Sequence, residues 1–322
     1  MIEPFGRGSI CYKPYVGDGS AKERIDDLLR QAEEAEAAGF DGIAISEHHL
    51  GFPGYLPNPL QAASWILAHT SRIWVAPAPM LLLLRPLNLV AEELAWLSAR
   101  HPGRVAVGFA AGSMIADFEL VGSNQDDLTA RYESALREVV PTLAGDPPRA
   151  LRADPALDLL ASHPIPAISA ASSHTACRRA ASVGCGILLE SAVAEAEVAR
   201  MVGTYRNAGG TGAVVLVRRV WVGDDPPIAL EAERDALVRS TVPVYKRDSW
   251  LAPSDMIISG SAEQLAQRLG AVIEATGADA LNLRVHVPGL APSVVQDQVA
   301  ALADVLTYVR GGRVSDRAPR GR

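Results

Sequence analysis

The segment SEHHLGFPGYLPNP at residues 46–59 begins with Ser46, Glu47, His48 and His49, directly after an apolar run. Imidazole and carboxyl groups exchange protons close to neutral pH, so this segment is a candidate for acid–base catalysis. Adjacent side chains of an extended segment point in opposite directions, so both histidines cannot face one small centre unless the chain turns. We therefore expect one histidine to pack structurally and one to face the site. We predict no metal site, because a metal would require spaced ligands and a third donor.

Hydroxyl side chains gather in the segment IPAISAASSHTACRRAASVG at residues 165–184, where an apolar run leads into a helical pattern. Backbone N–H groups at a helix N-terminus, with the hydroxyls of Ser172, Ser173 and Thr175, can bind an anion such as a phosphate. The same residue types also cap ordinary helices. An anion site and a simple capped helix both remain open.

Arg284 and His286 share one face of an extended segment near the end of the chain, because they are two residues apart. On an interior face, both side chains would need a partner or a function to offset the cost of burial. On an exterior face they would simply meet a helix, and both alternatives remain open. Two further features are Gly112, which allows a close backbone approach, and APAPM at residues 76–80, where either X–Pro bond could be cis.

These residues must be positioned by eight apolar, β-rich segments that alternate with eight helical patterns. This alternation predicts an α/β fold, and the count favours a (β/α)8 barrel (TIM barrel) whose active site lies at the C-terminal ends of the strands. An open doubly wound sheet would require a GxGxxG turn after its first strand, and the sequence has none there. We expect strands at 8–12, 40–46, 72–78, 104–110, 165–170, 185–190, 212–222 and 279–287, and helices at 21–39, 58–70, 86–100, 126–144, 174–183, 194–208, 261–276 and 292–309.

Two connections are longer than such a barrel requires, at residues 145–164 and 223–260. We expect both to reach the C-terminal mouth as insertions and to roof the pocket. The sequence has neither an internal repeat nor a second core. We therefore predict one domain over residues 1–310, followed by a flexible basic tail over residues 311–322.

Composition excludes several functional classes. The 322 residues include 37 acidic and 30 basic ones, and the net charge of −7 disfavours nucleic acid as a partner. Three cysteines without CxxC spacing argue against a disulfide framework or structural zinc, so we expect a cytoplasmic protein. The longest apolar run, residues 75–84, is half of what a membrane span needs. Serine-nucleophile, HExxH and P-loop motifs are absent, which disfavours hydrolases and phosphotransferases.

The chain resembles the bacterial luciferase-like monooxygenase family over most of residues 8–310. The likeness is carried by AGFDGIAISEHH with NP shortly after it, SRIWVAPAPMLLLLRPLNLVAEELAWLSARHPGRVAVGFAAG, DFELVG, IPAISAASSHTACRRAASVG and SGSAEQLAQRLGAVIEATGADALNLRVHVPGL, in that order. The resemblance implies a TIM barrel that binds reduced FMN and activates dioxygen, or that binds a deazaflavin coenzyme in a sister branch. An Asp-His pair is usual in the deazaflavin branch, so Glu47-His48 favours FMN.

The resemblance also implies roles for single residues. His48 matches the active-site histidine of the family, and we expect Glu47 and His286 to act with it. Ser173 matches a serine that holds the flavin phosphate, with Ser172 and Thr175 beside it, and we expect Ala78 and Gly112 to contact the cofactor. Luciferases place a phosphate-binding arginine after the fourth strand, where this sequence has Ala110, Ala111 and Gly112. The candidates to replace it are Arg7, Arg85 and Arg178.

The sequence therefore predicts a two-component flavin monooxygenase that takes reduced FMN from a separate reductase and oxygenates a small organic substrate with dioxygen. The alternatives are a deazaflavin-dependent oxidoreductase, which transfers hydride, and a non-enzymatic flavin-binding protein, whose known examples lack parts of the barrel. An apolar mouth would protect the chemistry from water. Its candidate walls are Val75, Ala78, Met80, Phe109 and Trp250. The family usually forms homodimers through two helices that here contain Trp65, Ile66, Leu94 and Trp96, unless these residues face the barrel instead.

Overall fold

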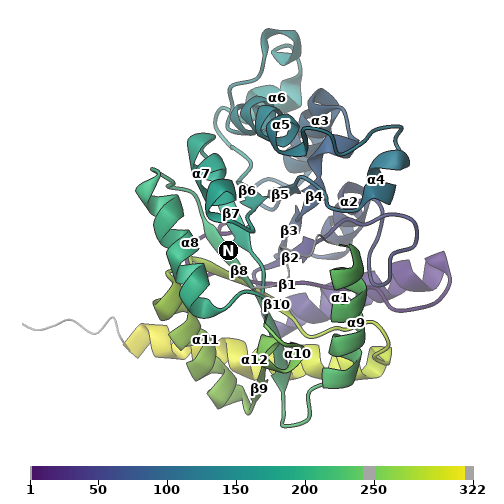
Figure 1. Ribbon diagram of the computed structural model, residues 1–322, viewed down its shortest axis with the longest axis vertical. Coiled ribbons are helices and arrows are strands. Elements are labelled where there is room, and N and C mark those ends of the chain that lie inside the picture. Colours follow the sequence, from purple (N-terminus) through teal and green to yellow (C-terminus); the bar gives the residue numbers. More distant parts are fainter. Residues whose placement is uncertain (1, 242–250, 316–322) are drawn as a thin grey trace, which may run out of the picture.

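The computed structural model describes residues 2–241 and 251–315. Parallel strands form a closed barrel surrounded by helices (Figure 1). The order around the ring is β3, β2, β1, β10, β8, β7, β6 and β5. The barrel strands are β1 (Ile10–Tyr12), β2 (Gly42–Ile45), β3 (Trp74–Pro77), β5 (Val107–Ala110), β6 (Ala167–Ala170), β7 (Gly186–Leu189), β8 (Val214–Val222) and β10 (Ala280–Arg284).

The ring closes between β3 and the chain just before β5. Val75 pairs in parallel with Val105 there, and its N–H donates to the Arg104 carbonyl oxygen at 2.8 Å. The N–H of Ala106 donates back to the Val75 carbonyl at 3.1 Å. The predicted (β/α)8 barrel is therefore confirmed.

The outer layer contains the eight helices that the sequence predicts, with shifted ends. Capping residues explain where two of these helices begin and where one of them ends. Ser20 caps α1 in a capping box with Glu23, and Gly39 ends it at a φ of 94°, while α11 begins with a second capping box at Ser261. The layer comprises α1 (Ala21–Ala38), α2 (Pro59–His69), α3 (Leu87–Arg100), α5 (Leu128–Leu143), α7 (His174–Ser182), α8 (Glu195–Asn207), α11 (Ala262–Thr276) and α12 (Pro292–Ser315).

Two separate apolar clusters follow from the alternation along the strands. The larger one includes helix residues and therefore lies between the strands and the outer layer. The smaller one contains strand residues such as Cys11, Ala44, Ala76 and Val215 but no helix residue, so it fills the barrel interior. Strand residues two positions beyond an interior residue continue the interior face toward the mouth.

The two long connections lie at opposite ends of the barrel. The described parts of the second connection, residues 223–241 and 251–260, follow β8 and lie at the mouth, as predicted, where they form α9 (Ile228–Thr241), α10 (Pro253–Met256) and β9 (Ile257–Gly260). Residues 145–164 join the end of α5 to the start of β6, so the prediction that they reach the mouth is wrong. Their helix α6 (Pro155–Leu159) lies beside α3 on the outside (Figure 1). The indole N–H of Trp96 in α3 donates to Asp154, which caps α6.

Smaller elements were not predicted. The strand β4 (Met80–Leu81) adds to β5, and β9 pairs with the far half of β8. The helix α4 (Ile115–Glu119) follows β5 at the mouth. At the C-terminus α12 continues to Ser315, so the first residues of the expected tail are helical, and residues 316–322 lie outside the described residues.

Several apolar predictions change with the observed packing. Val75, Met80 and Phe109 belong to the outer cluster, so they cannot be walls of the mouth, and Trp250 lies outside the described residues. Ile66 and Leu94 are fully buried and cannot contact a second subunit. The side chain of Trp96 is 55% exposed and Trp65 is partly buried.

All three cysteines are buried and free. Among the described helices, none combines the length and the apolar character needed to cross a lipid bilayer.

Candidate active site

Glu47 follows β2 and is fully buried, where it organises the mouth rather than facing it. Its carboxylate accepts hydrogen bonds from the backbone N–H of Leu81 at 2.7 Å and from Arg85 Nη2 at 2.7 Å. Its Oε1 also lies 2.9 Å from His49 Nε2. His49 is therefore the structural histidine of the pair. Arg85 is committed to Glu47, which argues against Arg85 as the replacement phosphate-binding arginine.

His48 faces the mouth. Its ring stacks on Phe52 at a centroid distance of 4.8 Å and meets the edge of Tyr55 at 4.4 Å. The side chain retains 24% exposure, and Nδ1 lies 3.8 Å from Asp117 Oδ2. Two aromatic rings thus fix the orientation of an imidazole that can exchange a proton at the mouth while a carboxylate lies behind it.

Asp117 in α4 is the partner that sequence reasoning missed. Its carboxylate is buried, and neither oxygen has a hydrogen-bond donor among the described residues, so His48 is the nearest group that can neutralise it. The turn that brings α4 here depends on Gly112, whose φ is 89°. A Cβ at Gly112 would lie 3.0 Å from the Phe118 ring. Gly112 therefore positions Asp117, a role that its predicted cofactor contact did not include.

The Ala78–Pro79 bond after β3 is cis, so one of the two candidate X–Pro bonds has the cis form. Ala78 is fully buried on the interior face, and its carbonyl oxygen accepts a hydrogen bond from Ser46 Oγ at 3.2 Å. The N–H of Glu47 donates to the Pro79 carbonyl at 3.0 Å. This turn therefore holds the chain at Ser46 and Glu47, directly before His48.

The N-terminus of α7 presents polar groups at the mouth end of β6. Ser173 is its N-cap and accepts from the N–H of Ala176 at 3.2 Å, while Ser172 and Thr175 are exposed. No described residue accepts a hydrogen bond from the N–H of His174 or Thr175. Arg178 Nη2 lies 3.3 Å from Thr175 Oγ1 and adds a positive charge. The exposed hydroxyls, free N–H groups and guanidinium fit a phosphate group.

The remaining arginine candidate is in the wrong place. Arg7 precedes Gly8, whose N–H donates to the carbonyl of Asp279 at the start of β10. That end of the barrel is opposite the mouth. Of the three candidates, only Arg178 lies beside the predicted phosphate-binding residues.

Arg284 and His286 are on the interior face, which settles the alternative that the sequence left open. Arg284 and Arg219 both form ion pairs with the buried Glu231 of α9, and Arg234 Nη1 lies 3.5 Å from the same carboxylate. A cavity of only about 10 Å³ remains among these side chains. The arginine cluster is therefore tightly packed and occupied by its own carboxylate.

His286 lies beneath Tyr15, with the two rings nearly perpendicular at 6.2 Å. Burial lowers the pKa of His286 to about 4, so the ring is neutral at pH 7. Tyr15 is also buried, and its hydroxyl lies 3.1 Å from Arg234 Nη2, 3.3 Å from Arg284 Nη1 and 3.1 Å from Tyr55 Oη. Burial would raise the pKa of Tyr15, but Arg234, Lys13 and Arg284 lower it to about 7.

Sequence reasoning also missed Lys13, Tyr15 and Glu190. Lys13 and Glu190 follow directly on β1 and β7, and Tyr15 lies three residues after the end of β1. The signal was present in the sequence, because a charged residue immediately after an apolar strand is the position at which barrel sites gather. It was applied to the second strand but not to the first and sixth.

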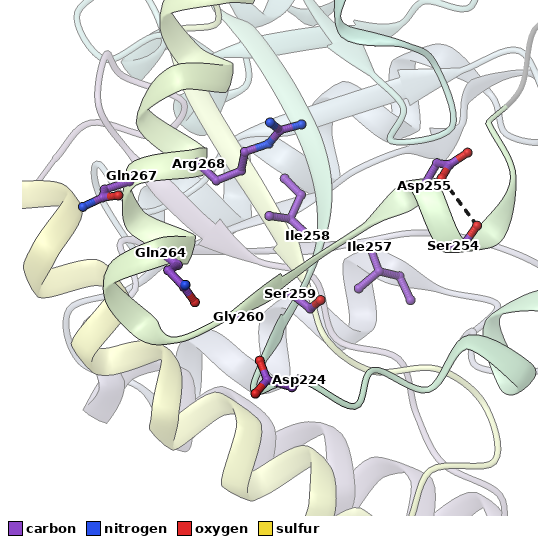
Figure 2. Close-up of a pocket in the computed structure, with 10 residues that line it drawn as sticks. All are labelled: Asp224, Ser254, Asp255, Ile257, Ile258, Ser259, Gly260, Gln264, Gln267 and Arg268. Carbon is purple, nitrogen blue, oxygen red and sulfur yellow. Dashed lines mark hydrogen bonds between the residues drawn. The ribbon is translucent and has the colours of Figure 1, made fainter.

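A larger hollow, of about 950 Å³, lies away from the barrel interior (Figure 2). Its labelled side chains come from β9, from α10, from the first turns of α11 and from the turn after β8, and most are polar. It contains none of the residues around His48. Within residues 2–241 and 251–315, no group of three or more His, Cys, Asp or Glu side chains could hold a metal ion.

Comparison with known proteins gives both family and fold. The model of the family described as luciferase-like monooxygenase matches residues 9–280. The alkanal monooxygenase alpha chain of Photorhabdus luminescens is 29% identical over 129 residues, which cover 40% of this chain and 35% of that protein. The chain therefore matches only about a third of that relative's length.

Two solved structures illustrate the fold. The oxygenating constituent of 3,6-diketocamphane monooxygenase from Pseudomonas putida, in complex with FMN, has a TM-score of 0.74 at 18% identity, covering 94% of this chain and 98% of that chain. An F420-dependent secondary alcohol dehydrogenase in complex with an F420-acetone adduct has a TM-score of 0.71 at 17% identity, covering 96% and 100%. At these identities the likeness shows the fold alone. Together with the family match over residues 9–280, the barrel establishes that this chain belongs to the luciferase-like monooxygenase family.

Proposed function

We propose that this protein is a flavin-dependent monooxygenase that uses reduced FMN and dioxygen to insert one oxygen atom into a small organic substrate. The observation that carries the proposal is the pair formed by His48 and the buried Asp117 at the barrel mouth, 3.8 Å apart. The family match and the anion-binding features at the N-terminus of α7 support it.

His48 is the group that moves a proton in this proposal. Its exposed edge faces the mouth, and Asp117 stabilises the protonated ring from behind. Glu47 has a positioning role, because its carboxylate is fully used by Leu81, Arg85 and His49. His286 is a buried, neutral support for Tyr15 rather than a proton carrier.

The cofactor phosphate would bind at the N-terminus of α7, through Ser172, Thr175 and Arg178 and the free backbone N–H groups. The flavin ring would lie over Ala78 and the turn at Gly112. When bound, reduced FMN supplies the electrons that activate dioxygen. The protein supplies the phosphate contacts, the floor beneath the ring and the protonating group.

Three further parts of the proposal concern partners and place. A separate reductase would supply reduced FMN, the protein would act in the cytoplasm, and two copies would form a homodimer. The homodimer surface is the exposed side of α3, where Leu89 is 52% and Trp96 is 55% exposed. These residues are two helical turns apart and lie on one face.

An anaerobic titration with reduced FMN and, separately, with reduced deazaflavin tests the cofactor assignment. Each complex is then mixed with oxygenated buffer in a stopped-flow spectrometer. We expect saturable binding of reduced FMN and reoxidation kinetics that differ from those of free reduced FMN. Binding of deazaflavin alone, without reaction with oxygen, would contradict the monooxygenase and indicate hydride transfer. Binding of FMN without any turnover in a substrate screen would favour the non-enzymatic flavin-binding alternative.

A further inference from the structure

The side chain of Lys13 faces the barrel interior at the mouth. Two positions before it, Cys11 belongs to the interior cluster, whereas the hydroxyl of Tyr12 reaches outward to Gln31 of α1 at 2.7 Å. The backbone N–H of Lys13 still donates to the Leu283 carbonyl at 2.8 Å, so the strand geometry continues through this residue. The alternation of the strand therefore directs the ammonium inward.

The Lys13 ammonium has no direct ion-pair partner among residues 2–241 and 251–315. The residue is only 3% exposed, yet among the described residues none hydrogen-bonds to Nζ or places a carboxylate oxygen within 4.0 Å of it. Nζ lies 6.0 Å from the centroid of the Tyr15 ring. Nζ is not among the sealed, unpartnered polar atoms, so it still borders open space. A buried ammonium without a direct ion pair is costly, and an anion from outside the chain that paired with it would offset this cost.

The neighbouring arginines are not free to bind an outside anion, because they already contact a carboxylate of their own chain. Arg219, Arg234 and Arg284 all contact Glu231, and Arg219 Nε also donates to Ser191 Oγ at 2.9 Å. They nevertheless add to the positive potential around Lys13. Lys13 is the cation of this group that remains free to bind a ligand.

Glu190 is the second unpaired charge in the same space. It follows Leu188 of the interior cluster by two positions, and its side chain is exposed. Within the described part of the chain, its carboxylate accepts a hydrogen bond only from the N–H of Ser191, at 3.2 Å. Partial desolvation at the mouth would raise the pKa of Glu190, but Lys13 and the surrounding arginines lower it, so Glu190 is ionised at pH 7. Lys13 and Glu190 interact electrostatically, but no ion pair within 4.0 Å joins them.

We infer that Lys13 forms an anion subsite on the charged side of the mouth (Lys13, Glu190, Arg219 and Arg284), and that the substrate carries a carboxylate which Lys13 binds. Glu190 would accept a hydrogen bond from a hydroxyl or amine of the same molecule. The inference rests on the proposed function in taking the barrel mouth as the substrate site. This side of the mouth is formed by β7, β8, β10 and β1, whereas the predicted flavin contacts follow β3, β5 and β6.

The test measures binding to flavin-free protein by calorimetry, with benzoate and 2-naphthoate as probes and their primary amides as neutral controls. We expect the acids to bind at least tenfold more tightly than the amides to the unmodified protein, and we expect this preference to disappear in Lys13→Met. The matched control is Lys22→Met, since Lys22 is an exposed lysine of α1 paired with Asp26, and it should keep the preference. Failure of every acid to bind, or an equal preference in Lys13→Met, would overturn the inference.

Two further measurements separate the possible sources of the anion and the effects on folding. The anaerobic affinity for reduced FMN should be unchanged in Lys13→Met; a loss confined to reduced FMN would mean that Lys13 contacts the flavin anion, and would overturn the assignment to substrate. The Tm of ligand-free Lys13→Met should not fall and should rise by about 2 °C, because an unpaired buried charge is removed. A large fall in Tm would show that Lys13 stabilises the fold instead. Because the acid and amide titrations contain no flavin, their outcome is independent of the proposed oxygenase activity.

Discussion

At the scale of single residues, the mouth contains two kinds of ionisable group. Some are already paired within the chain, and others are not fully hydrogen-bonded. Glu47 and Glu231 are saturated by donors from their own chain. His48 and Asp117 face each other at 3.8 Å without a complete hydrogen-bond set. Saturated carboxylates hold positions, whereas incompletely satisfied groups are the ones that a ligand or a proton can change.

His48→Ala should lower substrate-dependent oxygen consumption by about 10²-fold or more, since a positioned acid–base group contributes on that order. The affinity for reduced FMN should stay within a few fold, because the predicted phosphate contacts lie on α7. Asp117→Asn should give a smaller loss and shift the pH profile of turnover, as expected for a positioning residue. Equal losses of turnover and flavin affinity in His48→Ala would refute the role assigned to His48.

Tyr15 should titrate close to neutral pH. Its pKa is lowered from its ordinary value of 10.0 to about 7 in the folded protein, so the folded state loses the phenol proton first. Stability relative to Tyr15→Phe should therefore increase as the pH rises from about 7 to about 10, and this extra stability should disappear as the pH falls through 7. Tyrosinate absorbance at 295 nm, recorded for both proteins, checks this. A Tyr15→Phe protein with an unchanged titration near pH 7 would contradict the assignment.

At the scale of elements, the site depends on short segments after the strands rather than on the strands themselves. The helix α4 brings Asp117 to His48, the loop at 47–58 brings Phe52 and Tyr55, and α9 brings Glu231 and Arg234. The strands fix only where these segments start. Small changes in a connecting turn should therefore affect the site more than the barrel.

Gly112→Ala should move α4 and reduce activity. An L-residue in the left-handed region costs about 1–2 kcal/mol, and here the new Cβ would also lie 3.0 Å from the Phe118 ring. Gly122→Ala is a matched control, because Gly122 also has a positive φ, of 67°, but nothing within 4 Å of its Cβ position. Chemical denaturation should show a larger loss for Gly112→Ala, and only this variant should lose turnover. Equal effects would mean that Gly112 has no special role in placing Asp117.

Arg178→Met should weaken FMN binding by about tenfold through the loss of a charge-assisted contact to the phosphate. Riboflavin, which has the same ring system without the phosphate, should bind equally well to both proteins. Fluorescence titration with the two ligands makes this comparison. A parallel loss for riboflavin would place Arg178 elsewhere in the binding site or in the stability of α7.

At the scale of the whole molecule, the charge of the mouth is opposite to that of the chain. The chain has a net charge of −7, whereas the side of the mouth formed by β7, β8, β10 and β1 gathers four cations, Lys13, Arg219, Arg234 and Arg284, around two carboxylates, Glu190 and Glu231. An acidic surface with a cationic mouth directs small anions toward the barrel opening. The affinity for anionic probes should accordingly weaken as salt concentration rises.

The proposed homodimer can be tested through the exposed side of α3. Leu89→Asp should convert a dimer to a monomer, because it places a charge in the centre of an apolar contact surface. Tyr308→Asp is the control, since Tyr308 is an exposed aromatic residue of α12, on another part of the barrel. Light scattering after size exclusion gives the mass of each variant. A monomeric unmodified protein, or a dimer that survives Leu89→Asp, would contradict this interface.

The sequence alone determined the barrel, the outer layer of eight helices and the histidine segment after the second strand. Apolar runs, capping residues and helix-ending glycines are local signals, and all of them can be read in one dimension. Chain direction also determines the end of the barrel at which a connection lies: a segment from a strand to a helix lies at the mouth, and one from a helix to a strand lies at the opposite end. Residues 145–164 join α5 to β6, so this rule places them opposite the mouth.

Only the tertiary structure decided which charges pair. Asp117 lies 69 positions after His48 in the sequence, and Glu231 lies on a helix far from Arg284, so no local pattern links either pair. The inward direction of Arg284 and His286, the use of Arg85 by Glu47, and the unpaired state of Lys13 likewise depend on contacts between separate strands and loops. The physical reason is that ion pairing and burial are properties of three-dimensional neighbours, which sequence spacing does not encode.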